Sequence, residues 1–380
     1  MARAKPAAAV AAAAGLLASI ATQVRVARPA QPLTDQWQRT PVAQRGPTRL
    51  GISFRPLQAA TFGLDPAEAL DRLLGYPFEL VRLAAYWDRI EPQPGVSDFG
   101  ELDRHIDAVA AAGREIILCV GAVKAFGYPE YFVPVHHTPE PLPERRLIDA
   151  TTHGPLLESA CGFVARVVER YRDRPSIIAW QVEHEAVDPL GMEHSWRLSA
   201  DFVAQEIAAV READPSRPIL MNGFLPTSAP VAITQRWRTR GQGDSLDVAT
   251  RLADIVGVDF YPRHAIAAKA GRSVYLDGRR GPWQRRRRSL FTAGRELMVC
   301  EGQAEPWEAV TRPPSQPAVG MYSCLPEHVI DVYNQCIRWN DDATVAMSAY
   351  LFWGAEYWLL REREGDPSYL DAFQRILRES

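Results

Sequence analysis

The sequence predicts an α/β protein with a single (β/α)8 (TIM) barrel domain over residues 49–380. Two observations support this fold. Eight short apolar runs recur from residue 50 onward, and most are followed by a loop and then by a helical pattern. These runs are continuously apolar rather than alternating, which is typical of parallel strands buried on both faces. Eight such units over roughly 300 residues match the size and order of the barrel.

The predicted strands come in the order that a barrel requires. They are residues 50–54, 80–83, 116–120, 177–182, 219–221, 255–260, 297–300 and 349–353. A doubly wound open sheet is the alternative. The first strand is not followed by a Gly-x-Gly-x-x-Gly turn. We therefore expect no dinucleotide site. No other cofactor is expected either.

Helical patterns occupy the connections between the strands. Asp65 and Pro66 supply an N-cap and a first-turn proline, which predicts a helix that begins there. Apolar residues at three- and four-residue spacing predict further helices over residues 102–110, 157–167, 196–213, 326–339 and 369–378.

The composition is that of an ordinary globular protein. Apolar residues make up 47% of the chain, and 43 basic against 46 acidic residues give a net charge of −3. This balance excludes a disordered or collagen-like chain and gives no reason to expect nucleic acid as a partner. The run from Arg285 to Arg288 is interpreted as part of a solvated helix. Five cysteines without any Cys-x-x-Cys pair predict no zinc site and no disulfide framework.

The N-terminus has the order of a secretory signal. Arg3 and Lys5 precede an apolar stretch from Ala7 to Ala21 that ends in small residues. We expect a signal peptide over residues 1–21, cleaved or retained as an anchor, then a linker over 22–48 and a secreted or periplasmic location. An alanine-rich disordered extension is the alternative. No stable membrane span is expected, because a span needs about 20 apolar residues.

Polar and aromatic side chains follow several of the predicted strands. Glu183, His184 and Glu185 end the fourth strand. Glu301 ends the seventh strand, 116 residues beyond Glu185. The carboxyl ends of barrel strands carry the active site in this fold, so we expect both carboxylates at one mouth of the barrel. Paired carboxylates are what the cleavage of a glycosidic bond requires, because one must protonate the leaving oxygen while the other attacks or stabilises the cation.

The same segments resemble a known group of enzymes. The run from Ile178 to Glu185 resembles the fourth-strand signature of the retaining (β/α)8 glycoside hydrolases, in the clan that includes families 5 and 42. The run from Leu297 to Glu301 resembles the seventh-strand signature of that clan, and the run from Phe352 to Gly354 resembles the eighth-strand aromatic. The segment Gln181–Glu183 is similar to the corresponding segment in the β-galactosidase branch of family 42.

The resemblance implies a role for each matching residue. Glu185 would be the acid/base, and Glu301 the nucleophile. Arg82 would brace the nucleophile, Tyr261 would hydrogen-bond it, and Trp353 would be the aromatic residue that stacks on a sugar ring. A carbohydrate would then be the substrate, as in a β-galactosidase, a β-glucosidase or a family-5-like β-glycanase.

One position departs from the pattern. His184 stands where the clan has an asparagine that contacts the sugar 2-hydroxyl. An imidazole can also donate to a hydroxyl, so the role can survive. The alternative function is a non-catalytic carbohydrate-binding barrel that has lost turnover.

Other interpretations of the same residues stay open at this point. Glu305 could be the nucleophile in place of Glu301, or it could line the rim. In a regular strand the side chain of Glu183 would point to the same face as that of Glu185, although a structural hydrogen-bond role is preferred for Glu183. Further candidates for substrate contacts, each of which could instead be packing, are Trp87, Tyr261, Trp307 and Trp353.

A metal is not expected at the fourth strand. A zincin helix requires His-Glu-x-x-His, and the residue four positions after His184 is Asp188.

Overall fold

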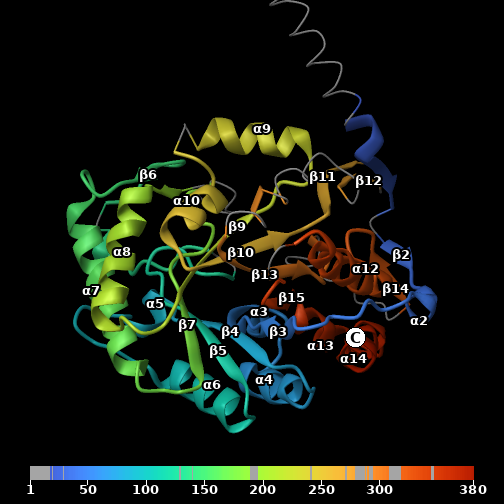
Figure 1. Ribbon diagram of the computed structural model, residues 1–380, viewed down its shortest axis with the longest axis horizontal. Coiled ribbons are helices and arrows are strands. Elements are labelled where there is room, and N and C mark those ends of the chain that lie inside the picture. The colour runs from blue at the N-terminus through green and yellow to red at the C-terminus, as the bar shows by residue number, and fades with distance from the viewer. Residues whose placement is uncertain are drawn as a thin grey trace, which may run out of the picture.

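Eight parallel strands close into a barrel (Figure 1). Its members are β3 (Arg49–Ser53), β4 (Leu80–Ala84), β5 (Glu115–Cys119), β7 (Ile177–Gln181), β9 (Ile219–Phe224), β10 (Ile255–Phe260), β13 (Glu296–Gln303) and β15 (Ala349–Trp353). They lie around the barrel in chain order, and β15 pairs with β3 to close it. All eight predicted strands and the barrel are confirmed, and the open sheet is wrong.

The computed structural model describes residues 18–380 except 19, 29, 128–129, 139, 189–195, 240–241, 270–271, 279–286, 288, 291–293, 308–317 and 344–345. The predicted signal peptide lies almost entirely outside the described residues, as does the arginine run apart from Arg287. Among the helices of the described part, none combines the length and the apolar character that crossing a bilayer would need.

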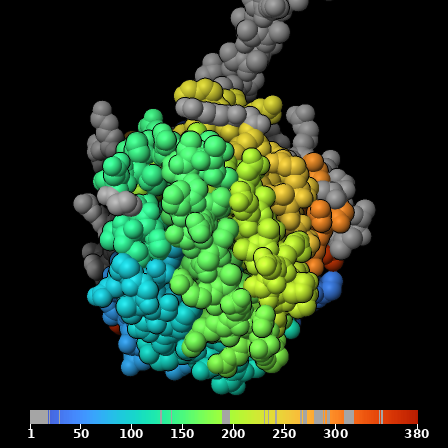
Figure 2. Space-filling model, turned by 90° about the vertical axis from the view of Figure 1, so that its left-hand side faces the viewer, coloured from blue at the N-terminus to red at the C-terminus, as the bar shows by residue number. Residues whose placement is uncertain are grey.

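Helices surround the barrel, and the predicted ones are present. They are α4 (Pro66–Leu74), α6 (Gly100–Ala111), α7 (Gly154–Tyr171), α8 (Ala200–Ala213), α12 (Pro326–Ile337) and α14 (Ser368–Glu379). The Asp65 side chain caps α4 by accepting from the amides of Ala67 and Glu68. Figure 2 views the side on which α7 and α8 lie, where a green to yellow-green surface covers the barrel. Further helices are α3 (Pro56–Thr61), α5 (Trp87–Ile90), α9 (Ala229–Arg238), α10 (Ser245–Leu252) and α13 (Ala355–Arg363).

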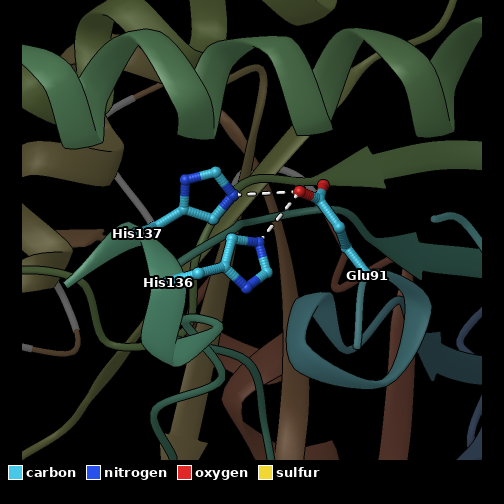
Figure 3. A group of neighbouring side chains, drawn as sticks. All are labelled: Glu91, His136 and His137. Atoms are coloured by element: carbon cyan, nitrogen blue, oxygen red, sulfur yellow. Dashed lines mark hydrogen bonds and ion pairs between the residues drawn. The ribbon is translucent and has the colours of Figure 1, made fainter. Parts of the chain in front are cut away.

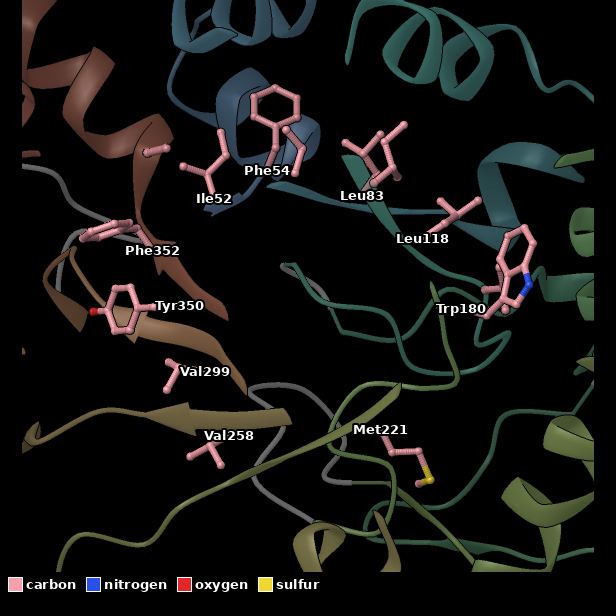
Figure 4. Close-up of a cluster of buried hydrophobic side chains, with 14 of the residues drawn as sticks. Ile52, Phe54, Leu83, Leu118, Trp180, Met221, Val258, Val299, Tyr350 and Phe352 are labelled. Carbon is pink, nitrogen blue, oxygen red and sulfur yellow. The ribbon is translucent and has the colours of Figure 1, made fainter. Parts of the chain in front are cut away.

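The strands present two apolar faces, one to the barrel interior and one to the helices. The interior cluster includes Leu80, Ile117, Leu220, Met298, Cys300 and Leu351. The outward face belongs to the main core, shown in Figure 4, and includes Ile52, Leu83, Leu118, Trp180, Met221, Val258, Val299 and Phe352. Burial on both faces explains why the strands are continuously apolar in the sequence.

The segment 22–48 differs from the expected linker. It contains β1 (Val24–Ala27), β2 (Ala30–Pro32) and α2 (Gln36–Arg39). β1 pairs with β12 (Arg272–Asp277), which also pairs with β11 (Arg263–Lys269), and β2 pairs with β14 (Val319–Met321). β1 and β2 are only four and three residues long, too short to give a readable alternation, and backbone hydrogen bonds at a sheet edge do not require one. A smaller pair joins β6 (Leu147–Ile148) to β8 (Arg197–Leu198).

Two loops at the carboxyl end of the barrel touch backbone to backbone at Gly121. A Cβ at this position would lie 2.1 Å from the amide nitrogen of Glu183 and 2.4 Å from its Cα. A glycine is therefore required where the loop after β5 crosses the loop after β7.

We expect Gly121→Ala to lower the free energy of unfolding by about 1–3 kcal/mol, because backbone atoms must move apart to admit the methyl group. The matched control is Gly162→Ala in α7, where a Cβ would meet nothing within 4 Å. That control should leave stability unchanged or raise it by about 0.5–1 kcal/mol. Denaturant titration of both variants measures the difference, and equal stabilities would contradict the required close approach.

Candidate active site

A pocket opens at the carboxyl ends of the strands. Glu185 and Glu301 both line it, so the structure brings together the two carboxylates selected from the sequence. The other lining residues among those described are Arg55, Gln58, Gly127, Glu130, His184, Phe224, Val231, Tyr261, His264, Glu305, Trp307 and Trp353.

A β-bulge directs Glu301 toward the pocket. Met298 and Cys300 both belong to the interior cluster, so strict alternation would turn Glu301 outward. The pairing of β13 with β10 shifts at this point, since Val258 pairs with Val299 but Asp259 pairs with Glu301. The extra residue returns the Glu301 side chain to the interior, as bulges beside active sites commonly do.

Two donors hold the Glu301 carboxylate. Arg82 Nη1 donates to Oε1 at 2.7 Å, and the Tyr261 hydroxyl donates to Oε2 at 2.5 Å. Arg82 is completely buried, and its Nε donates to Gln181 Oε1 at 2.6 Å. Its guanidinium also lies 3.9 Å from the ring centroid of Phe126. Arg82 thus braces Glu301 from inside the barrel and is not among the pocket-lining residues, although a substrate contact was expected for it.

Glu185 has the opposite environment. Its side chain is buried, and burial raises its pKa well above the ordinary range. The negative charges of Asp259, Asp188, Glu130 and Glu301 act in the same direction. The electrostatics therefore favour a protonated Glu185, whereas Glu301 faces the Arg82 cation.

Asn222 and Asp259 complete the site and were missed from the sequence. Asn222 Nδ2 lies 2.5 Å from Asp259 Oδ2 and 2.9 Å from His184 Nδ1, and its Oδ1 accepts from Gln181 Nε2 at 3.0 Å. Asp259 also hydrogen-bonds Glu185, and burial raises its pKa well above the usual value. Asp259 lies within the predicted strand 255–260, and Asn222 directly follows the predicted strand 219–221. A lone polar residue in or directly after an apolar run is the available signal, because a buried polar group needs a partner.

The contacts of His184 define its proton position. Burial lowers its pKa well below the usual value, and the charges of Arg82 and Lys124 lower it further, so the ring is neutral. Because Asn222 Nδ2 is a donor, Nδ1 of His184 is the acceptor. The single ring proton is then on Nε2. Since His184 lines the pocket, its ring can serve there as a donor.

Glu183 is a structural hydrogen-bond partner, as preferred from the sequence. Its carboxylate accepts from the amides of Val123 and Lys124 at 2.8 and 2.6 Å. The strand β7 ends at Gln181, and both Glu183 and Glu185 have positive φ. Their side chains therefore do not follow the alternation of a regular strand, which would point them to the same face. Lys124 Nζ in turn donates to the backbone oxygen of Glu185 at 2.8 Å.

Glu305 forms an ion pair with Arg55. Arg55 Nη1 and Nη2 donate to its two oxygens at 2.7 and 2.8 Å, and Arg55 also contacts Glu356 at 2.6 Å. The same guanidinium lies 4.1 Å from the ring centroid of Trp353. Glu305 therefore fixes one wall of the pocket, which agrees with the expectation that it lines the rim.

The predicted aromatic contacts divide into two groups. Tyr261, Trp307 and Trp353 line the pocket, with the rings of Tyr261 and Trp307 4.8 Å apart. Trp87, expected at a substrate subsite, is instead fully buried in α5, where its ring stacks on Phe163. The short helix after β4 turns this side chain toward α7 rather than toward the barrel mouth, a difference that the sequence did not reveal.

Comparison with known proteins agrees with this arrangement. Residues 70–195 match the family model described as "Beta-galactosidase" (Glyco_hydro_42). The β-galactosidase Bga of Halorubrum lacusprofundi is 28% identical over 148 residues, which are 36% of this chain and 20% of that protein. The β-galactosidase BgaH of Haloferax lucentense is 28% identical over 118 residues, or 28% of this chain and 17% of that protein. The matched regions thus span about a fifth of the curated relatives' length.

Solved structures share the fold. GH5_18 from Streptomyces cattleya, in complex with GlcNAc, superimposes with a TM-score of 0.54 at 15% identity and covers 88% of this chain and 81% of that chain. The β-galactosidase from Rahnella sp. R3 gives a TM-score of 0.51 at 12% identity, over 88% of this chain and 57% of that chain. The predicted resemblance to the (β/α)8 glycoside hydrolases is confirmed.

Proposed function

We propose that the protein is a retaining β-glycosidase in which Glu185 is the acid/base and Glu301 the nucleophile. The observation that carries the proposal is the contrast between two carboxylates in one pocket. Glu185 has a raised pKa, whereas Glu301 is paired with Arg82 and hydrogen-bonded by Tyr261. The matches to β-galactosidases support the substrate class, a β-linked glycoside.

The first half of the reaction cleaves the glycosidic bond. Glu301 attacks the anomeric carbon while Glu185 transfers its proton to the leaving oxygen, so the alcohol departs neutral and a glycosyl ester forms on Glu301. Arg82 and Tyr261 orient the attacking carboxylate and share its charge. The Tyr261 hydroxyl stays protonated, because burial and the Glu301 charge raise its pKa well above the usual value.

The second half releases the sugar. Once Glu301 is an ester its negative charge is gone, and one of the charges that raised the pKa of Glu185 is removed. Glu185, now ionised, takes a proton from water as the water oxygen attacks the anomeric carbon. The ester bond breaks, Glu301 recovers its charge, and the sugar leaves with its original configuration.

Glu301→Ala should abolish turnover of aryl β-glycosides, because the glycosyl ester cannot form. Added azide or formate should restore part of the rate by entering the space of the missing carboxylate, and the product should have inverted configuration. A panel of aryl β-galactosides, β-glucosides and β-mannosides measures both effects. The matched control is Glu115→Gln, a half-exposed carboxylate paired with Arg49 at the opposite end of the barrel. An unaffected rate in Glu301→Ala would rule out the assignment.

His184→Asn should keep much of the wild-type kcat, because an amide restores a donor toward the substrate, whereas His184→Leu should lose about 100-fold or more. The two variants are assayed with the same panel, and their melting temperatures check the fold. Equal rates for His184→Leu and wild type would exclude a hydrogen-bonding role.

If instead sugars raise the melting temperature of wild type while no glycoside is cleaved, the protein is the non-catalytic barrel.

The pH dependence should show the raised pKa of Glu185. Its proton is needed in the first step, so kcat/KM should be highest below that pKa and fall as the pH rises through it. With Glu185→Gln and a dinitrophenyl glycoside, whose leaving group needs no proton, this alkaline limb should disappear from kcat/KM. An alkaline limb unchanged in the variant would assign it to another group.

We also propose that the protein is exported, because residues 1–21 place a basic segment, an apolar stretch and small residues in the order of a secretory signal. The N-terminal sequence of protein recovered outside the cytoplasm tests this. A chain that remains inside with Met1 intact would contradict it.

A further inference from the structure

Three side chains with metal-binding chemistry meet outside the pocket. Glu91 follows α5, and His136 and His137 lie in a short 3-10 turn after β5 (Figure 3). Both imidazoles direct Nε2 at the same carboxylate oxygen, Glu91 Oε1, at 3.2 and 3.0 Å. Glu91 is buried, and the side chains of the two histidines are each 19% exposed. An ion could reach this group from solvent.

The second oxygen of Glu91 is held from behind. Arg166 Nη2 on α7 donates to Oε2 at 2.6 Å, and Trp87 Nε1 donates to it at 3.2 Å. The carboxylate is thus held with Oε2 fixed and Oε1 directed at the two imidazoles.

The spacing of the three ligand atoms suits a small divalent cation. One nitrogen from each histidine and one oxygen from Glu91 lie within 4.8 Å of one another. Zinc bonds of about 2.0–2.2 Å place neighbouring tetrahedral ligands roughly 3.3–3.6 Å apart. Separations of 3.2 and 3.0 Å thus need only small movements to admit the ion. Donors behind a ligating carboxylate are the usual support of such a site.

We propose that Glu91, His136 and His137 bind one divalent cation of the zinc class, with water completing the coordination. The site joins the loop after β5 to the segment after β4. That loop also carries Gly127 and Glu130, which line the pocket, and Phe132, whose carbonyl accepts from the amide of Asp88 at 2.8 Å. The role of the ion is to fix this wall of the pocket, so the proposal is independent of the reaction at Glu301.

The test is calorimetric titration of Zn²⁺ into untagged full-length protein freed of metal with a chelator, since a histidine tag would bind zinc itself. We expect one saturable equivalent and a higher melting temperature. The double variant His136→Ala/His137→Ala should lose both effects, and Glu91→Gln should weaken binding by about tenfold or more. The matched control His153→Ala removes the N-cap histidine of α7, whose Nδ1 lies 3.7 Å from an Asp149 carboxylate oxygen, and it should bind as wild type does.

Two results would overturn the proposal. One is the absence of saturable Zn²⁺ binding by wild type, which would make the cluster a set of hydrogen bonds only. The other is undiminished binding by the double variant, which would place the ion elsewhere, for example at the second group of possible ligands, His184, Asp259 and Glu301. Circular dichroism of each metal-free variant confirms that it is folded, so a loss of binding reports on the site.

Discussion

The ion pair between Arg82 and Glu301 is the interaction on which the site depends. Both side chains are nearly inaccessible to water, and their closest contact is 2.7 Å. A buried charge of either sign is costly without its partner, so each residue keeps the other in place. Gln181 and Phe126 enclose the guanidinium, which fixes the direction from which it approaches the carboxylate. In the proposed reaction, a carboxylate held in this way attacks without further reorganisation.

The rest of the site sets Glu185 apart from Glu301 although both line one pocket. Glu301 faces a cation and a hydroxyl, while Glu185 faces further carboxylates and little water. This division favours a proton on one group and a charge on the other, which a double displacement requires. Asn222 connects the surroundings of the two carboxylates, since it contacts both Asp259 and His184. Burial and the charges of Arg82 and Lys124 keep His184 neutral by lowering its pKa, while Asn222 orients the ring.

The sequence revealed the barrel and the two carboxylates because both leave local signals. Continuous apolar runs mark the strands, and Glu185 and Glu301 stand just beyond such runs or at their ends. The bulge that turns Glu301 inward leaves no such signal, because it depends on the register between β13 and β10. The positive φ at Glu183 and the burial of Trp87 also depend on loops packed by distant residues. Glu91 lies 45 residues before His136, so only the fold could bring them together.

In the proposed double displacement, Glu301 forms a covalent bond to the sugar. The most direct measurement is peptide mapping by mass spectrometry after incubation with 2,4-dinitrophenyl 2-deoxy-2-fluoro-β-glycosides of galactose, glucose and mannose, whose fluorine slows release of the ester. We expect the fluorosugar on Glu301 and on no other residue. A label on Glu305, or turnover of a parent glycoside with no label from its fluorinated counterpart, would contradict the account.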